Sequence, residues 1–377
     1  MFRKNFSDTA AHRWHFYSDT RLHRCRSLSD GRNELRELLA ALRVRRPLVL
    51  SDANVIQSLS FAGLMATFDW SVALIGTEHD STRLDEAVTK LSSGRHDGLI
   101  AIGGGSVIDA AKLLAATPNG DCVALLHTEN ALIPSMPLIA VPTTFGTGAE
   151  MNMVSHLYVD GTKRSLRRHW LAPSVALVVT EIAGQVPERL RYFGVLDAYC
   201  HALEARDLRR ENSPLQRTLC DAALELIAQH GLAYIDKPDW ENAAAIATAS
   251  SYGGLIVNNA RTGLIHALAT PLAAATKSAH AESLRPCVLP ALRFNQAREP
   301  DMHRAQALVE RGAAWGNIDM STLVLDGLVD AVFTDTVLLK ENPVAYRRED
   351  VIEMFMGVLG DQTNHNPERT CQRADRD

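Results

Sequence analysis

Four side chains in the second half of the chain have the types and spacing of a divalent metal site. Asp197 and His201 are four residues apart, so on a helix both would lie on one face, one turn apart. His266 and His280 follow, the first in an apolar helical stretch. Three imidazoles and one carboxylate can hold a metal and leave positions for water or substrate. Taken singly, however, each histidine fits an ordinary core or surface position better.

A glycine-rich turn in the first half predicts a phosphate site. It follows the apolar run 98–102 and precedes a helical pattern over 107–116. Glycines at a strand-to-helix turn let a ligand approach the backbone, and the first amides of the helix face outward with partial positive charge. A purely structural turn is the alternative. The residues expected to contact a cofactor here are Gly103, Gly104, Gly105, Ser106 and Asp109.

A second polar turn, Pro142-Thr-Thr-Phe-Gly-Thr-Gly148, follows another apolar run. Two such turns at one edge of a sheet would form a cleft suited to a dinucleotide. Its glycines would allow close approach, and its hydroxyls would bind the ligand or merely stabilise the turn. The hydroxyls in question belong to Thr143, Thr144 and Thr147.

Asp52 ends an earlier apolar run. A carboxylate there accepts hydrogen bonds from a ribose diol and repels a 2′-phosphate, which favours NAD over NADP. An aspartate in this position is also a common helix cap. Both interpretations stay open on the sequence alone.

The secondary structure that must position these residues differs between the two halves of the chain. The first half alternates apolar runs with helical spacing over 84–91 and 107–116, which predicts a doubly wound, mostly parallel α/β sheet. Ligands on such sheets bind at the carboxyl ends of the strands. The runs expected to be strands are 47–51, 71–76, 98–102, 123–126 and 138–141.

Helical periodicity dominates from about Pro187, which predicts an all-α second region. We therefore expect a dinucleotide-binding domain over residues 1–186 and a helical, metal-binding domain over residues 187–377. The helices expected there are 193–206, 215–230, 241–258, 260–275, 285–295 and 326–339.

Composition narrows the class of protein. The 377 residues carry a net charge of −5, which argues against a nucleic-acid partner. The six cysteines form no CxxC pair, so free thiols in a reducing compartment are expected. The N-terminus has no apolar core, and no run of apolar residues is long enough to span a membrane. These features predict a cytoplasmic protein without a membrane partner.

The motifs together resemble the iron-containing (group III) alcohol dehydrogenase family. The resemblance rests on GGGSVIDAAK at 103–112, PTTFGTGAE at 142–150, DAYCH at 197–201, and the two later histidines. It implies an NAD(P)-binding α/β domain, a helical domain, and Fe²⁺, or in some members Zn²⁺, in the cleft between them. It also implies that family members form homodimers or larger homo-oligomers. The metal ligands carried over by position are Asp197, His201, His266 and His280, of which Asp197 and His266 would also serve catalysis.

Three positions depart from the family pattern. Ala281 follows His280 where the family often has glycine, and Thr180-Glu181 replaces an Asp-Pro pair. Thr270 stands where some members have a histidine that is thought to relay a proton. These changes concern the rate and the proton path more than the activity.

Local similarity suggests the substrate. The segments 259–272 and 161–166 resemble members that reduce phosphonoacetaldehyde to 2-hydroxyethylphosphonate. Their basic residues Lys163, Arg164 and Arg261 could bind an anionic substrate group, with Lys163 also able to serve the cofactor. The alternative is that these cations serve the fold or pair with carboxylates.

Other functions remain open. The same family includes general short-chain aldehyde and alcohol dehydrogenases. A lyase similar to dehydroquinate synthase would also use a nucleotide and a metal, but those enzymes use a Glu/His/His set. The departures also leave open a degenerate nucleotide-binding protein without activity.

Overall fold

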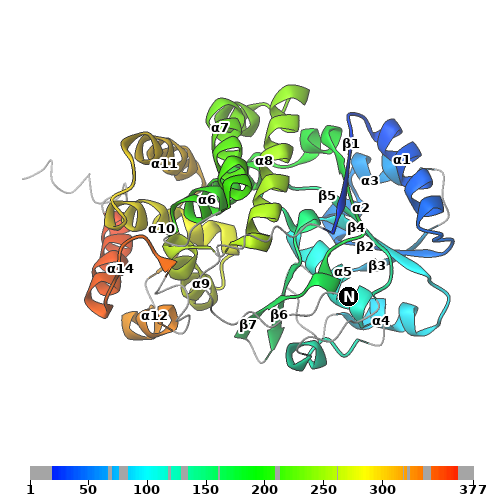
Figure 1. Ribbon diagram of the computed structural model, residues 1–377, viewed down its shortest axis with the longest axis horizontal. Helices are drawn as coiled ribbons and strands as arrows, with labels where there is room; N and C mark the ends of the chain where they lie inside the picture. The colour runs from blue at the N-terminus through cyan, green and yellow to red at the C-terminus, as the bar shows by residue number, and fades with distance from the viewer. Residues whose placement is uncertain are drawn as a thin grey trace, which may run out of the picture.

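The first half of the chain folds around one parallel sheet of six strands in the order β1-β8-β5-β4-β2-β3 (Figure 1). Every neighbouring pair in this sheet is parallel. The computed structural model describes residues 19–66, 70–75, 84–117, 120–128, 135–159, 162–208, 213–260, 262–316, 318–320, 323–333 and 341–363. The strands of the sheet are β1 (Arg21–Cys25), β2 (Pro47–Ser51), β3 (Ser71–Leu74), β4 (Gly98–Gly103), β5 (Leu138–Pro142) and β8 (Val175–Val179).

The strands read as continuous apolar runs because helices cover both faces of the sheet. Alternate residues of β2 divide between the two sides: Leu48 and Leu50 pack with α5, whereas Val49 packs with α1. Burial on both sides leaves the central strands fully enclosed. The helices of this region are α1 (Leu28–Ala41), α2 (Ala53–Ile56), α3 (Leu59–Met65), α4 (Asp85–Ser92) and α5 (Gly105–Ala116).

The predicted parallel α/β sheet is confirmed, with one wrong strand. The run 123–126 is not a strand: Ala124–His127 forms the short 3₁₀ helix η2. Asp121 Oδ1 accepts a hydrogen bond from the backbone N–H of Ala124, which bends the chain at that point. Gly76, at the end of the expected strand 71–76, lies outside the described residues.

An antiparallel hairpin was not predicted. β6 (Val154–Val159) pairs with β7 (Thr162–Arg167) beside the main sheet. Short 3₁₀ helices connect the remaining segments. They are η3 (Ala149–Met151), η4 (His169–Leu171), η5 (Thr180–Gln185) and η6 (Gly312–Trp315).

The second half is helical, as expected, and shares one apolar core. Six predicted helices correspond to α6–α10 and α12, although residues 334–339 of the last one lie outside the described residues. Of the two remaining helices, α11 was not predicted, and α14 contains residues 349–352, which resemble the last helix of the family. The bounds are α6 (Glu188–Asp207), α7 (Pro214–Asp236), α8 (Trp240–Asn259), α9 (Leu264–Thr276), α10 (His280–Phe294), α11 (Glu299–Arg311), α12 (Leu325–Val332) and α14 (Arg348–Thr363).

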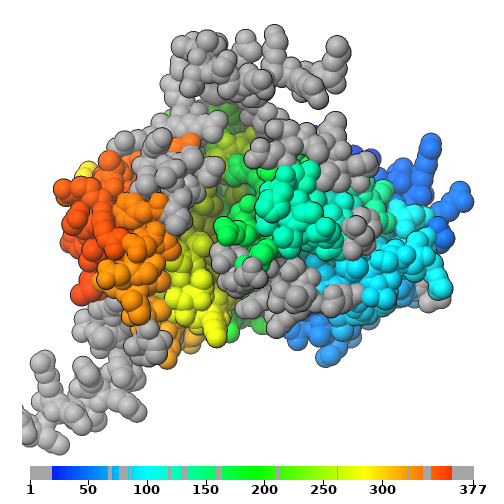
Figure 2. Space-filling view, turned by 90° about the horizontal axis from the view of Figure 1, so that it is seen from below, coloured from blue at the N-terminus to red at the C-terminus, as the bar shows by residue number. Residues whose placement is uncertain are grey.

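The two regions lie side by side, and Figure 2 shows the surface hollowed between the yellow and orange helices and the green and cyan residues. The last strand of the sheet ends at Val179 and the first long helix starts at Glu188. The division at residues 186 and 187 remains a prediction. No helix in the part of the chain that the structure describes is long and apolar enough to cross a membrane.

Candidate functional site

The predicted polar segments meet at the carboxyl edge of the sheet, after three neighbouring strands. Asp52 follows β2, the glycine turn ends β4, and the threonine turn follows β5. The backbone N–H of Thr143 donates to the carbonyl of Gly103 at 3.0 Å. The two turns therefore lie against each other.

The glycines of the first turn leave room that a side chain would fill. A Cβ on Gly104 would lie 3.2 Å from Thr144 Oγ1, and one on Gly105 would lie 2.9 Å from Thr147 Oγ1. Helix α5 begins directly after Gly104, without a side-chain cap on its first amides. Bare backbone, hydroxyls and uncapped amides are suited to the phosphates of a dinucleotide.

The glycines of the second turn allow two helices of the second region to approach closely. A Cβ on Gly146 would lie 2.6 Å from Gly194 Cα on α6. Gly148 has φ of 59° and lies against Ser250 and Gly254 of α8. Helices α6 and α8 thus occupy the Cβ side of these glycines, and the approach of a ligand to this turn remains a prediction.

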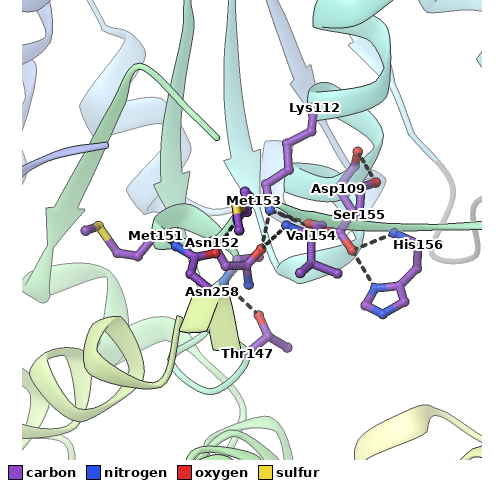
Figure 3. Close-up of polar contacts among 11 residues, drawn as sticks. Asp109, Lys112, Thr147, Met151, Asn152, Met153, Val154, Ser155, His156 and Asn258 are labelled. Atoms are coloured by element: carbon purple, nitrogen blue, oxygen red, sulfur yellow. Dashed lines mark hydrogen bonds and ion pairs between the residues drawn. The ribbon is translucent and has the colours of Figure 1, made fainter. Parts of the chain in front are cut away.

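Two other predicted cofactor residues have partners within the protein. Asp52 caps α2, and its Oδ1 accepts from the amides of Asn54 and Val55. Asp109 is buried, and Figure 3 shows its carboxylate between Lys112 and His156. Ser106 lies in the first turn of α5 and provides no side-chain cap. Asp52 is thus a helix cap, its contact with a ribose remains a prediction, and Asp109 has contacts inside the protein.

The predicted metal ligands are brought together. Asp197 and His201 lie on one face of α6, and α9 carries His266 beside them. The ligand atoms of these three residues all lie within 4.8 Å of one another. His280 starts α10, and its ring centroid is 5.4 Å from that of His266.

The site fits a metal because its buried polar atoms lack partners in the protein. Among the described residues, Asp197 Oδ1, His201 Nδ1 and His266 Nε2 are buried without a hydrogen bond. Asp197 Oδ1 is 3.5 Å from His266 Nε2 and 3.7 Å from a ring nitrogen of His201, beyond good hydrogen-bond length. Leaving such atoms unsatisfied is costly, and a cation between Asp197 Oδ1, His266 Nε2 and the nearer ring nitrogen of His201, Nε2, would satisfy the first two.

The charges of the site support the same conclusion. Burial by itself would raise the pKa of Asp197, but the histidines around it, His201 first, hold that pKa below its ordinary value. Burial would lower the pKa of His266, but Glu204 and Asp197 raise it to about 9. A metal bound at Nε2 of His266 would therefore compete with a second proton at that nitrogen.

Glu204 is a residue of the site that the sequence analysis missed. It lies on the same face of α6 as Asp197 and His201, seven and three residues further along. Its Oε2 accepts from Nδ1 of His266 at 2.5 Å, and its Oε1 accepts from the Ile265 amide. The bond to Nδ1 turns Nε2 toward Asp197, as a supporting carboxylate does for a metal-binding histidine. The spacing from His201 was the available signal.

Replacing this carboxylate tests its role. Glu204→Gln keeps the shape but loses the charge, so we expect metal affinity to fall by about 10- to 100-fold. Titration with a competing chelator measures the affinity. Glu225→Gln, on the exposed face of α7, is the matched control and should bind metal like the parent protein. Equal affinity in both variants would contradict the role.

The residues expected to bind the substrate have few described contacts. Arg164 is exposed on β7, where it pairs with Leu157 of β6. Lys163 precedes it in the same strand, and Arg261 lies outside the described residues. The Thr270 hydroxyl donates to the carbonyl of His266 within α9. Of the three cations, only Arg164 has a described side chain, and substrate binding by Lys163, Arg164 and Arg261 remains a prediction.

The arrangement of a parallel α/β sheet and a helical region is that of solved alcohol dehydrogenases. The structure of 1,3-propanediol oxidoreductase matches with a TM-score of 0.80 at 18% identity and covers 92% of this chain and 100% of that one. Sulfoacetaldehyde reductase from Bifidobacterium kashiwanohense, solved with NAD⁺, matches with a TM-score of 0.78 at 19% identity, covering 92% and 99%. At these identities the likeness concerns the fold.

The sequence defines the family. Residues 24–180 match the description "Iron-containing alcohol dehydrogenase", and residues 192–315 match "Fe-containing alcohol dehydrogenase family, C-terminal". The chain belongs to the iron-containing alcohol dehydrogenase family.

Curated relatives align over part of their length. Long-chain-alcohol dehydrogenase 1 of Geobacillus thermodenitrificans is 34% identical over 205 residues, 53% of this chain and 52% of that protein. Probable alcohol dehydrogenase EutG of Escherichia coli is 32% identical over 236 residues, which are 60% of this chain and 58% of that protein. The aligned part thus spans little more than half of these relatives.

Proposed function

We propose that this protein is a metal-dependent oxidoreductase that transfers a hydride between NAD(P)H and a small aldehyde or primary alcohol. The observation that carries this proposal is the set of Asp197, His201 and His266, whose ligand atoms lie within 4.8 Å of one another, with Asp197 Oδ1 and His266 Nε2 buried and without hydrogen-bond partners. The glycine turn at the sheet edge supports the nucleotide. Family membership supports both.

The residues present divide the work of such a reaction. When bound, Fe²⁺ or Zn²⁺ would polarise a carbonyl oxygen and reduced nicotinamide would supply the hydride. Asp197, His201, His266 and His280 would hold the metal, and Glu204 keeps His266 oriented toward it. The two turns would bind and orient the dinucleotide, and burial of the site limits access of water.

NAD is the proposed cofactor, with NADP as the alternative, and Asp52 supplies the test. Asp52→Gly removes the carboxylate but keeps a tolerated cap residue, so the helix should lose little stability. We expect the ratio of kcat/KM for NADH over NADPH to fall about tenfold, since a hydrogen bond to a charged group is worth about 1.5–3 kcal/mol. Asp239→Gly, which changes the cap of α8, is the control. An unchanged ratio would remove Asp52 from the ribose site.

For the substrate we propose a small aldehyde with an anionic group, with phosphonoacetaldehyde as the leading candidate. The similarity of segments 161–166 and 259–272 to reductases of that compound supports it. Sulfoacetaldehyde reductase, a protein of similar fold, is named for an aldehyde that carries an anionic group. The exposed position of Arg164 instead favours the second candidate, a general short-chain aldehyde reductase.

A substrate panel separates the two candidates. Phosphonoacetaldehyde, sulfoacetaldehyde and the uncharged butyraldehyde are compared with Fe²⁺- and Zn²⁺-loaded protein and with both cofactors. Higher kcat/KM for the anionic aldehydes is expected. Equal or better turnover of butyraldehyde would reject the phosphonate proposal and leave the general reductase. A cytoplasmic location and a homodimer or larger homo-oligomer remain predictions.

A further inference from the structure

A histidine–carboxylate pair outside the metal residues has the geometry of a proton donor. His156 lies on β6, and its Nδ1 is 2.9 Å from Asp109 Oδ2 on α5. The backbone N–H of His156 donates to the same oxygen at 3.2 Å. This double contact fixes both the ring and its tautomer, with the proton on Nδ1, so proton exchange runs through Nε2.

Buried groups hold the carboxylate of this pair in place. Lys112 has no solvent exposure, and its Nζ donates to Asn152 Oδ1 and Val154 O at 2.7 Å. The same Nζ lies 3.4 Å from Asp109 Oδ1. The ammonium of Lys112 thus lies beside the carboxylate that contacts the ring of His156. The network therefore joins α5, which carries the glycine turn, to β6.

The imidazole of this pair reaches solvent, whereas its carboxylate is buried. The side chain of His156 is 36% exposed, whereas that of Asp109 is 10% exposed. In Figure 3 the imidazole points away from Lys112. A buried orienting carboxylate behind a solvent-accessible imidazole is the arrangement that general acid–base catalysis uses.

Helix α8 brings this part of β6 close to the metal residues. Asn258 of α8 accepts from the Met153 amide at 2.7 Å, just before β6. Gly253, five residues earlier on the same helix, would place a Cβ 3.9 Å from His201 Cβ. Burial is the main cause that lowers the pKa of His201, and the charge of His156 lowers it further. The two rings thus lie within electrostatic range.

We propose that His156, held by Asp109, donates the proton that completes aldehyde reduction in this protein. The inference rests on the proposed function, which supplies the hydride. The hydride adds to the carbonyl carbon, and the electron pair of the C=O π bond moves to oxygen. The Nε2–H bond of protonated His156 breaks as the new O–H bond forms, directly or through one water. The imidazole then regains a proton from solvent, and the reverse sequence serves alcohol oxidation.

The test uses His156→Asn in the metal-loaded protein. The asparagine amide stands in for Nδ1 and keeps the bond to Asp109, but it cannot transfer a proton. We expect kcat to fall by about 100-fold or more, with KM for the aldehyde unchanged and partial rescue by added imidazole. Metal content by elemental analysis and NADH affinity by fluorescence should match the parent protein. His303→Asn, on the exposed face of α11, is the matched control.

A second readout does not depend on activity. Histidine ¹⁵N NMR of the metal-free protein should show His156 protonated at Nδ1, and Asp109→Ala should abolish that preference. A neutral ring protonated at Nε2 in the parent protein would overturn the inference.

The kinetic outcomes are equally decisive. Unchanged kcat in His156→Asn would overturn the inference. So would a rise in KM confined to anionic aldehydes, which would make His156 a substrate-binding residue. Loss of metal or NADH binding, or a defect that imidazole does not rescue, would reduce His156 to a structural role. An inactive parent protein would instead overturn the proposed function, and the inference with it.

Discussion

His266→Ala should lower aldehyde turnover by about a thousandfold or more, because Lewis-acid stabilisation is worth several kcal/mol and about 1.4 kcal/mol corresponds to tenfold in rate. The imidazole contributes a buried Nε2 that faces Asp197 and has no hydrogen-bond partner in the protein. Its removal also leaves Glu204 without its Nδ1 partner. Steady-state NADH oxidation and elemental analysis of the reconstituted variant measure the two losses together.

A folding defect must be separated from loss of the metal. Circular dichroism and the unfolding midpoint of the metal-free variant report on the fold. His266→Gln, which keeps a polar group of similar reach, should be folded and equally inactive. His303→Ala, on the surface of α11, should match the parent protein. Turnover retained in the His266 variants would reject the ligand role.

Lys112→Met should lower the free energy of unfolding by about 3–5 kcal/mol, because it removes one partner of a buried ion pair. Lys112 has no solvent exposure, and burial lowers its pKa while Asp109 opposes that shift. Methionine would leave Asn152 Oδ1 and Val154 O without this donor and Asp109 without its cation. Urea unfolding of the metal-free protein measures the change.

An exposed lysine provides the comparison. Lys237, at the end of α7, is exposed, and Lys237→Met should change stability by less than about 0.5 kcal/mol. A Lys112→Met variant that unfolds at the same urea concentration as the parent protein would mean that the buried network contributes nothing to stability.

Most strands whose residues are fully buried were predictable, although β8 (Val175–Val179), which is equally apolar and buried, was not among the predicted strands. The runs 47–51, 98–102 and 138–141 are apolar without interruption because helices cover both faces, and each became a strand. The run 123–126 is equally apolar but only four residues long, a length at which apolar residues do not distinguish strand from helix. At this run the hydrogen bond from the Ala124 amide to Asp121 favours a 3₁₀ helix over a strand.

Edge positions escaped prediction for a related reason. β1, with the sequence Arg-Leu-His-Arg-Cys, pairs only with β8 among the described strands and is partly exposed. Its charged residues interrupt the run of apolar residues by which a buried strand is predicted. The hairpin of β6 and β7 likewise mixes basic and apolar residues at the margin of the sheet.

The site was predictable in part. Asp197 and His201 could be predicted to lie together because residues four apart share one face of a helix. No sequence spacing places α9 and α10 beside α6, so the inclusion of His266 and His280 in the site depended mainly on the family resemblance. Glu204 required the tertiary contact between α6 and α9. Asp109 was assigned to the cofactor because it follows the glycine turn, but on α5 its side chain turns to Lys112 and His156.

The most direct test of the proposed function is anaerobic titration of the metal-free protein with Fe²⁺, with NADH oxidation by an aldehyde followed at each step. We expect activity to rise from near zero and to saturate at one metal per chain, with no rise in His266→Ala. Full activity in the metal-free protein, or none after stoichiometric metal is bound, would contradict a metal-dependent oxidoreductase centred on Asp197, His201 and His266.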